Sequence, residues 1–462
     1  MTQKNKIVGT LVPISALRSK NQSPNNFGTF QTGLAFLDWL KKTDQNAWQL
    51  LPLHQTQLEA DSRTKHVPSP YKGYGIGLDP RYLTKGLKET EEREELKSFV
   101  DRNKYWIEDY ALFCALRDHF GTDDWREWDS GLSSRKKAVI DNYSKLLRRE
   151  IDHHILIQCL LHKEYEELKH KAEKLGIILI GDLPFYISIK SPLVWAHQYA
   201  FQLEKDGRTK YVSGLPDTPL AHFGRQIWGH PLYRWGEQAQ NKKVTDFWKI
   251  RLKYLASIFD SMRFDHAKGL FDYGVIHPRN KKIDKFVKGP GGPVLKVLID
   301  YCKSLNLSIF AEDSGENLSE LRITLKKLEI SGIKIFRFAL NEKKKKLNQE
   351  YASVSSYHKK TVAYTTTHDT ETLISYLEIL NYEQKRKIVA YANIKYSEDI
   401  LVLAQRIRKA IISSPAQMVI IPIQDWLLTT DRINIPGTEK EKNDPNWRYM
   451  LTIPVEDLPI IF

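Results

Sequence analysis

Cysteine is scarce in this chain of 462 residues, and long apolar runs are missing. The three cysteines, Cys114, Cys159 and Cys302, are isolated in apolar, helical contexts and match no zinc or redox spacing. Such residues are typical of buried free thiols in a reducing cytoplasm. The lack of about 18 consecutive apolar residues excludes a membrane-spanning helix. The polar N-terminus lacks the apolar region of a secretory signal, so we expect a cytoplasmic protein with no membrane partner.

Signatures of nucleic-acid binding are also missing, although the chain is basic. It carries 70 Lys+Arg against 56 Asp+Glu, a net charge of +14. The basic residues are spread out, except for four lysines at 343–346, which we interpret as a solvated loop or a helix start. No helix-turn-helix, zinc or RNA-binding motif accompanies them, so we expect no nucleic-acid partner. The 41% hydrophobic content is typical of a sizeable soluble core.

Eight short apolar runs predict the strands of one sheet. They lie at 7–12 and 47–53, end at Asp182, His266 and Asp313, lie at 333–338, end near His368, and lie at 419–424. Amphipathic stretches at 32–42, 162–175, 245–258 and 293–305 separate several of them. This alternation predicts a parallel sheet, and eight units favour a closed barrel. The expected fold class is α/β, a (β/α)8 TIM barrel with inserted helical and loop subdomains and no C-terminal β-sandwich.

The spacing of the runs predicts two insertions into a single catalytic barrel that spans residues 1–462. Residues 83–160 are charged and helical in pattern, and we expect a helical insertion between the second and third strands. Residues 185–244 hold Gly, Pro and aromatic residues and predict a loop insertion over the active site. The tail after Asp425 is too short for a β-sandwich.

Carboxylates follow four of the apolar runs: Asp182, Asp265, Glu312 with Asp313, and Asp369. The C-terminal ends of the strands are where a (β/α)8 barrel keeps its catalytic groups. Carboxylates gathered there suit the cleavage of glycosidic bonds, which needs an acid and a nucleophile or base. A single such residue is more often a helix cap or part of a turn. For four runs arranged in this way we favour a catalytic site.

Asp265 and Glu312 close neighbouring strands, so their side chains are expected to converge at the barrel mouth. Arg263 lies two residues before Asp265 and points to the same face, where a guanidinium would hold Asp265 ionised. The apolar residues before Glu312 would raise its pKa and suit it to proton donation. The alternative for Arg263 and Asp265 is a structural ion pair.

Two further features suit sugar binding. His368 and Asp369 could hydrogen-bond sugar hydroxyls, and because no second His or Cys at ligand spacing accompanies them, we discount a metal site. The chain has 11 Trp, and Trp228 in the long 185–244 segment could stack on a sugar ring or belong to the core.

A colinear set of motifs resembles the 4-α-glucanotransferases (amylomaltase or disproportionating enzyme), family 77 of the glycoside hydrolases. The most specific are Gly181-Asp182-Leu183-Pro184-Phe185, Trp228-Gly229-His230-Pro231-Leu232-Tyr233, Arg263-Phe264-Asp265-His266, Ala311-Glu312-Asp313 and Thr367-His368-Asp369. Shorter matches lie at 9–17, 48–53, 69–71, 194–197, 289–291, 424–425, 432–434 and 436–438. The resemblance runs almost from end to end.

The resemblance implies a cytoplasmic enzyme without a cofactor that moves a glucan segment from one α-1,4-glucan to another. It implies that Asp265 is the nucleophile, Glu312 the general acid/base and Asp369 the carboxylate that binds hydroxyls of the distorted sugar. The substrate-binding residues that we expect are Tyr71, Asp182, Gln226, Trp228, Arg263, His368 and Asn434.

Several positions differ from the usual family motifs. Thr370-Glu371 stand where Asn-Asp is usual, Ala267-Lys268 replace Phe-Arg, and His230 and Ser314 replace Asn and Leu. The loop at 215–223 lacks the usual Tyr-Phe pair and is longer, so we expect weaker acceptor capture and more hydrolysis. Two other functions stay open: a related α-glucan hydrolase, in which water is the acceptor, and a catalytically weak glucan-binding protein.

Overall fold

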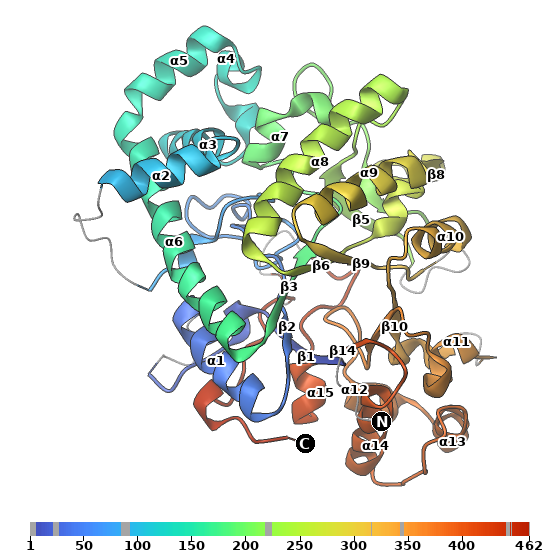
Figure 1. Cartoon of the computed structure of the whole chain (residues 1–462). Coiled ribbons are helices and arrows are strands. Elements are labelled where there is room, and N and C mark those ends of the chain that lie inside the picture. Colours follow the sequence, from blue (N-terminus) through green and yellow to red (C-terminus); the bar gives the residue numbers. More distant parts are fainter. Residues whose placement is uncertain are drawn as a thin grey trace.

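The computed structural model describes residues 6–21, 27–84, 93–217, 224–315, 317–341, 346–439, 444 and 446–461. Eight strands form its central sheet: β1 (Ile7–Leu11), β2 (Ala47–Gln49), β3 (Ile178–Leu183), β6 (Ser261–Phe264), β9 (Ser308–Ala311), β10 (Gly332–Ile335), β13 (Thr361–Tyr364) and β14 (Met418–Pro422). All pair in parallel, in the order β10–β13–β14–β1–β2–β3–β6–β9. A parallel bridge from Phe310 to Ser331 joins the two ends. The sheet is therefore the (β/α)8 barrel that the sequence predicts (Figure 1).

Alternate residues of each strand belong to two different cores. In β3, Ile180 packs inside the barrel, whereas its neighbour Leu179 packs in the core between the sheet and the helices. This is the period of two that a strand imposes on its side chains. Gly181 also faces outward, and a Cβ there would come within 2.3 Å of the Phe259 ring. Glycine therefore lets the neighbouring layer approach β3 closely.

The same alternation directs the first charged side chains into the barrel mouth. Arg263 lies between Met262 and Phe264, which both belong to the outer core, so Arg263 faces inward. Asp182 lies two residues after Ile180 and shares its inward face. Both charged residues are buried at the C-terminal ends of adjacent strands.

Helices account for much of the chain between β2 and β3. These are α2 (Arg93–Asn103), α3 (Ile107–Phe120), α4 (Ser130–Ser133), α5 (Lys137–Leu146) and α6 (Arg148–Leu175). α2 to α5 lie away from the barrel, and α6 runs from them down to β3 (Figure 1). α6 ends at Gly176, whose left-handed backbone (φ 71°) turns the chain into β3. The helical pattern in the sequence thus corresponds to real helices.

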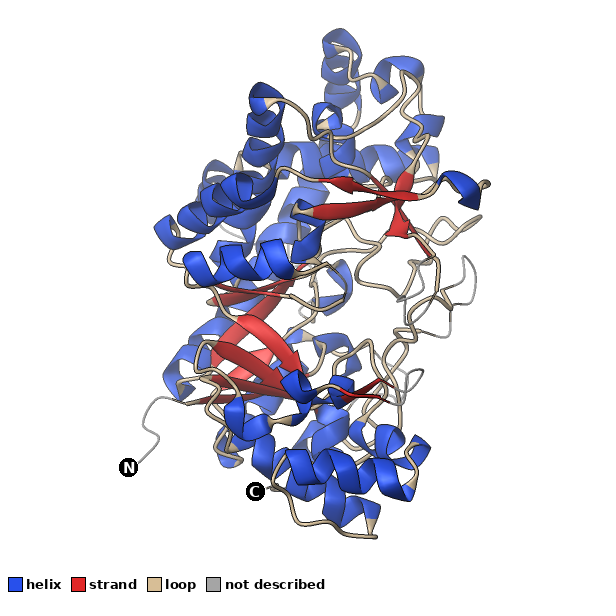
Figure 2. Cartoon of the chain, turned by 90° about the vertical axis from the view of Figure 1, so that its right-hand side faces the viewer, coloured by secondary structure: helices blue, strands red, loops and turns tan. Residues whose placement is uncertain are grey.

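The segment 185–244 has more regular structure than the loops expected from its sequence. It contains α7 (Pro192–Ala196), the antiparallel strands β4 (Val212–Leu215) and β5 (Gln226–Pro231), and the start of α8 (Gln238–Ile258). Val212 also bridges to Ile276, next to the ribbon formed by β7 (Asp272–Val275) and β8 (Lys285–Lys288). These ribbons stand apart from the barrel strands (Figure 2). The bridge from Val212 to Ile276 joins segments that are distant in sequence, which a local pattern does not reveal.

The remaining helices lie before β2 or after β8 in the chain. They are α1 (Phe30–Lys42), α9 (Gly291–Ser304), α10 (Ser319–Lys327), α11 (Gln349–Ala352), α12 (Leu373–Ile379), α13 (Tyr382–Tyr391), α14 (Ile400–Ile412) and α15 (Ile423–Leu427). β11 (Leu340–Asn341) and β12 (Lys346–Leu347) form a short ribbon. Of the lysine run, 343–345 lie outside the described residues and Lys346 is in β12. Beyond β14, the described residues include no strand, which agrees with the expected lack of a β-sandwich there. Among the described helices, none is long and apolar enough to cross a membrane.

Candidate active site

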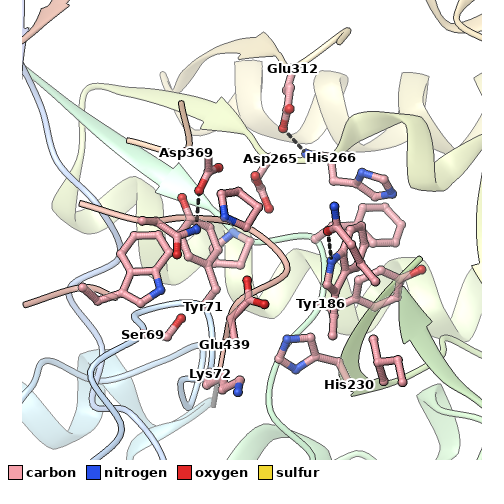
Figure 3. Close-up of a pocket in the computed structure, with 18 residues that line it drawn as sticks. Ser69, Tyr71, Lys72, Tyr186, His230, Asp265, His266, Glu312, Asp369 and Glu439 are labelled. Carbon is pink, nitrogen blue, oxygen red and sulfur yellow. Dashed lines mark hydrogen bonds between the residues drawn. The ribbon is translucent and has the colours of Figure 1, made fainter. Parts of the chain in front are cut away.

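A cleft at the C-terminal ends of the barrel strands gathers residues from distant parts of the chain. Its volume is about 920 Å³, which includes space that is open to solvent. Seven of the site residues expected from the sequence line it: Tyr71, Gln226, Trp228, Asp265, Glu312, Asp369 and Asn434. Figure 3 shows Asp265, Glu312 and Asp369 on one side of the cleft and Tyr186 and His230 on another.

The other three expected residues, Asp182, Arg263 and His368, are not among the lining residues. Their side chains are 0%, 6% and 1% exposed, and they lie behind the lining residues that they contact. They therefore support the wall of the cleft instead of forming its surface.

Arg263 is the centre of the buried charge cluster. Its Nη1 lies 2.5 Å from Asp182 Oδ2 and 3.0 Å from Asp265 Oδ1, and its Nη2 lies 2.9 Å from Glu312 Oε2. One guanidinium thus contacts a carboxyl group in β3 and the carboxyl groups of the residues that directly follow β6 and β9. A planar fork of donors suits this arrangement, which a lysine could not reproduce.

Glu312 has hydrogen-bond donors on both carboxyl oxygens. Oε2 accepts from Arg263 and, over 2.9 Å, from the backbone N–H of His266, and Oε1 accepts from the Ser314 hydroxyl over 2.7 Å. The backbone of His266 is left-handed (φ 46°), which is uncommon for a residue other than glycine. This conformation accompanies an amide that points at Glu312 (Figure 3).

The charge states of this cluster differ from those expected from the flanking residues. Burial raises the pKa of Asp265 well above its usual range; Arg263 works against this rise, and repulsion from Asp182 and Glu312 adds to it. Burial also opposes the charge on Glu312, but Arg263, the His266 amide and the Ser314 hydroxyl lower its pKa overall. The sequence suggested the reverse, because it did not show that donors from other elements converge on Glu312.

Asp369 is held in its ionised form by a separate group of donors. Its Oδ2 lies 3.1 Å from His368 Nε2, and its Oδ1 accepts from Asn434 Nδ2 over 2.7 Å. Burial works against the charge, but His368 and Asn434 lower the pKa of Asp369 to about 2. Tyr71 completes the group, since its hydroxyl lies 2.9 Å from His368 Nε2 and donates to Asp182 Oδ2 over 3.2 Å.

An aromatic wall faces these carboxylates. Trp228 in β5 packs edge-on against His266, with ring centroids 4.9 Å apart, and its Nε1 donates to Gln226 over 2.8 Å. Tyr186 and His230 stack nearby, with an interplanar angle of 10°. Burial lowers the pKa of His230 to about 3, so this ring is neutral at pH 7. Aromatic faces and neutral donors are suited to packing on sugar rings.

Sequence reasoning missed part of the site. Lys72, Glu439 and Trp447 line the cleft, and the Trp447 ring lies 5.3 Å from the Tyr71 ring. Trp447 and Glu439 belong to the C-terminal segment, and no local pattern connects them to a barrel strand. The expectation for the loop at 215–223 is not tested here, because 218–223 lie outside the described residues.

Asp313, the neighbour of Glu312, is turned away from the cleft. Its Oδ1 accepts from the Ile333 amide over 2.7 Å, and its Oδ2 accepts from Arg322 over 2.9 Å. It joins β9 to β10 and α10. Of the two adjacent carboxylates, only Glu312 is therefore available to a ligand.

Comparison with known families agrees with this geometry. The family described as 4-alpha-glucanotransferase, glycoside hydrolase family 77, matches residues 12–84 and 80–454. The chain belongs to this family. Curated 4-alpha-glucanotransferases are similar over nearly their whole length: that of Aquifex aeolicus is 27% identical and covers 96% of this chain and 95% of its own. That of Thermus thermophilus is 28% identical, with 90% and 89% covered.

The amylomaltase of Streptococcus agalactiae, solved in complex with acarbose, has a similar structure. It superposes with a TM-score of 0.81 at 26% identity and covers 96% of this chain and 95% of its own. Membership of the 4-α-glucanotransferase family therefore rests on sequence and on structure together.

Proposed function

We propose that this 4-α-glucanotransferase moves α-1,4-glucan segments by a retaining double displacement at the cleft of Asp265, Glu312 and Asp369. The observation that carries the proposal is that Arg263 contacts Asp265 and Glu312 at once. Two carboxyl groups held by one guanidinium are close enough for the paired roles of a retaining enzyme.

In the first step, a carboxylate oxygen of Asp265 attacks C1 of the sugar, and the bond from C1 to the leaving O4 breaks. Glu312 gives its proton to that oxygen, which leaves as a shortened glucan. In the second step Glu312 takes the proton from the 4-hydroxyl of an acceptor glucan. The acceptor oxygen then attacks C1, and Asp265 is released as a carboxylate.

The pKa directions of Asp265 and Glu312 oppose the roles proposed for them. Glu312 must give a proton, whereas its donors favour the ionised form, and Asp265 must attack as a carboxylate, whereas burial favours its protonated form. We propose that glucan binding draws Glu312 Oε2 away from Arg263 and the His266 amide. Loss of those donors raises the pKa of Glu312, while Arg263 remains 3.0 Å from Asp265 and favours its ionised form.

Asp369 has the position and charge to hold sugar hydroxyls in the subsite beside the broken bond. Its pKa of about 2 keeps it ionised at neutral pH, and an ionised carboxylate accepts strong hydrogen bonds. Asn434 donates to Asp369, and Tyr71, Trp228 and Gln226 also line the cleft. We assign Asp182, Arg263 and His368 to positioning these groups from behind.

We infer that the ligands are maltooligosaccharides and related α-1,4-glucans, and that acarbose, bound by the Streptococcus agalactiae amylomaltase, also fits this cleft. The proposed location is the cytoplasm, which the three buried free cysteines support.

Incubation with maltotriose, followed by separation of the products, tests the function. Transfer produces glucose together with a ladder of longer maltodextrins. Short products alone would indicate a hydrolase, and unchanged maltotriose would indicate a protein that only binds glucan. Either result would overturn the proposed transfer.

A further inference from the structure

Ser314 contacts the proposed acid/base from a position that neither the mechanism above nor the family motif uses. It lies beyond the end of β9, two residues after Glu312, and its Oγ donates to Glu312 Oε1 over 2.7 Å. The remaining donors to Glu312, Arg263 Nη2 and the His266 amide, are both on Oε2. The two carboxyl oxygens therefore have different partners.

This difference separates the oxygen that is held from the oxygen that reacts. Oε2 is on the side of Asp265, because the same guanidinium that contacts Oε2 also contacts Asp265. A proton on Oε2 requires that at least one of its two donors, Arg263 or the His266 amide, moves away, since both groups can only donate and a protonated oxygen accepts fewer hydrogen bonds. The Ser314 hydroxyl can keep donating to Oε1 in both protonation states.

We propose that Ser314 is a positioning residue that anchors Oε1 of Glu312, so that the exchanged proton resides on Oε2 and faces the sugar beside Asp265. The proposal rests on the role of Glu312 as the acid/base. Ser314 itself contacts neither the sugar nor Asp265, and it acts only through the Glu312 carboxyl group.

The charge on Glu312 is set by groups from several elements. Those that face it, besides Ser314, are Arg263, Asp265 and His266 at the end of β6, Asp182 in β3 and Tyr364 in β13. A hydroxyl that donates to a carboxylate stabilises the ionised form more than the protonated form. Loss of the Ser314 hydroxyl should therefore raise the pKa of Glu312, and it leaves the other groups in place.

The test compares S314A, S314T and S314V, with S133A as a control serine. Ser133 hydrogen-bonds the Trp125 carbonyl in the helical insertion, away from the cleft. For each variant, kcat and KM on maltotriose are measured across pH, together with the burst of fluoride released from α-glucosyl fluoride. Fluoride needs little protonation to leave, so its burst does not depend on Glu312 as an acid.

We expect the basic limb of kcat in S314A to move up by about one pH unit, the size of a lost hydrogen bond to a charged group. The plateau of kcat should fall on the order of tenfold with little change in KM, since the proton is no longer fixed on Oε2. The fluoride burst should stay near that of the wild type. S314T should restore the maltotriose profile, and S133A should match the wild type.

S314T and S314V have the same shape but differ in the hydroxyl, so their comparison decides the question even if S314A does not fold. An unshifted basic limb in S314V would overturn the proposal. An equal loss of activity on maltotriose and on α-glucosyl fluoride would also overturn it. That result would mean that Ser314 supports the fold or Asp265 instead. A wild-type enzyme that transfers no glucan would instead contradict the proposed function, and these outcomes are distinguishable.

Discussion

The backbone N–H of His266 donates to Oε2 of Glu312 over 2.9 Å, and so joins the residue after the proposed nucleophile to the proposed acid/base. The left-handed conformation of His266 places this amide at the end of β9. Because Asp265 precedes His266, this hydrogen bond ties the turn that carries Asp265 to the Glu312 carboxyl group. The two carboxyl groups are therefore linked by the backbone as well as by Arg263.

Replacement of Asp265 by asparagine should abolish transfer. An amide cannot form the glycosyl-enzyme ester, so we expect a loss of about 10⁴-fold or more in kcat on maltotriose. The fold should be retained, which circular dichroism and thermal unfolding would check. D300N serves as the matched control, since Asp300 is an exposed residue that pairs with Lys296 on α9. Near-normal turnover by D265N, free of deamidation back to aspartate, would refute the assignment.

The variant Glu312→Gln should separate the two steps of the reaction. Without an acid, turnover of maltotriose should fall by about 10²- to 10⁴-fold. α-Glucosyl fluoride should still load Asp265, and the glycosyl-enzyme should accumulate because the base for the second step is also missing. Mass spectrometry of the intact protein would detect the adduct, and D265N should show none. Equal losses on the two donors would show that Glu312 is not the acid.

The fold could be predicted because its signal is local. Eight apolar runs with helical patterns between them predict a parallel barrel, and each run overlaps a strand of the sheet. The period of two also distinguishes Glu312, which shares the inward face of Phe310, from Asp313, which turns toward Ile333. The sequence therefore contains this distinction between Glu312 and Asp313. The observation that carboxylates follow the strands does not reveal it.

The contacts between elements could not be predicted in the same way. The charge on Glu312 depends on Arg263 from β6, on a backbone amide and on a serine hydroxyl, and no flanking residue indicates that they converge. Trp447 reaches the cleft from the C-terminal segment. Such pairs are fixed by packing between distant segments, which leaves no periodic pattern in the sequence.

Glu371 should hold the loop that carries Asp369 in place through ion pairs. Its carboxylate pairs with Arg337 at 2.6 Å and with Arg432 at 3.2 Å, and Arg432 Nη2 also donates to the carbonyl oxygens of Asp369 and Asn434. We expect E371Q to raise KM for maltotriose and to lower the free energy of unfolding by about 1–3 kcal/mol at pH 7. The control is E329Q, because the carboxylate of Glu329 pairs with Lys360 but is largely exposed.

The effect of E371Q on the free energy of unfolding should depend on pH. Burial opposes the charge on Glu371, but Arg337 and Arg432 lower its pKa overall. A lowered pKa means that the ion pairs stabilise the fold above the unfolded pKa and lose this contribution as pH falls through the folded pKa. Urea unfolding of the wild type and E371Q should therefore converge in acid. A difference that is constant with pH would contradict the ion-pair role.

Asp123 and Asp124 offer a pair of neighbouring carboxylates with opposite pH dependence. Asp123 accepts from the Leu58 amide over 2.6 Å and so ties the helical insertion to the segment that carries Tyr71, but burial raises its pKa to about 6. For Asp124, burial is outweighed by Arg126, whose Nη2 lies 2.5 Å away, and the pKa is lowered.

We expect Asp123→Asn to stabilise the protein relative to the wild type as pH rises. With a raised pKa, folded Asp123 binds a proton that the unfolded chain releases, so its contribution to stability falls between about pH 4 and pH 6. Asparagine avoids that cost, and D123N should gain about 3 kcal/mol on the wild type between pH 4 and pH 8. D124N should change in the opposite direction, because the Arg126 pair stabilises the fold only above the unfolded pKa of Asp124. Urea unfolding measures this for D123N at pH 4 and pH 8 and for D124N at about pH 2 and about pH 5, because the Asp124 contribution is lost only below its unfolded pKa. The same sign for both variants would show that Asp123 is already ionised in the folded protein at low pH.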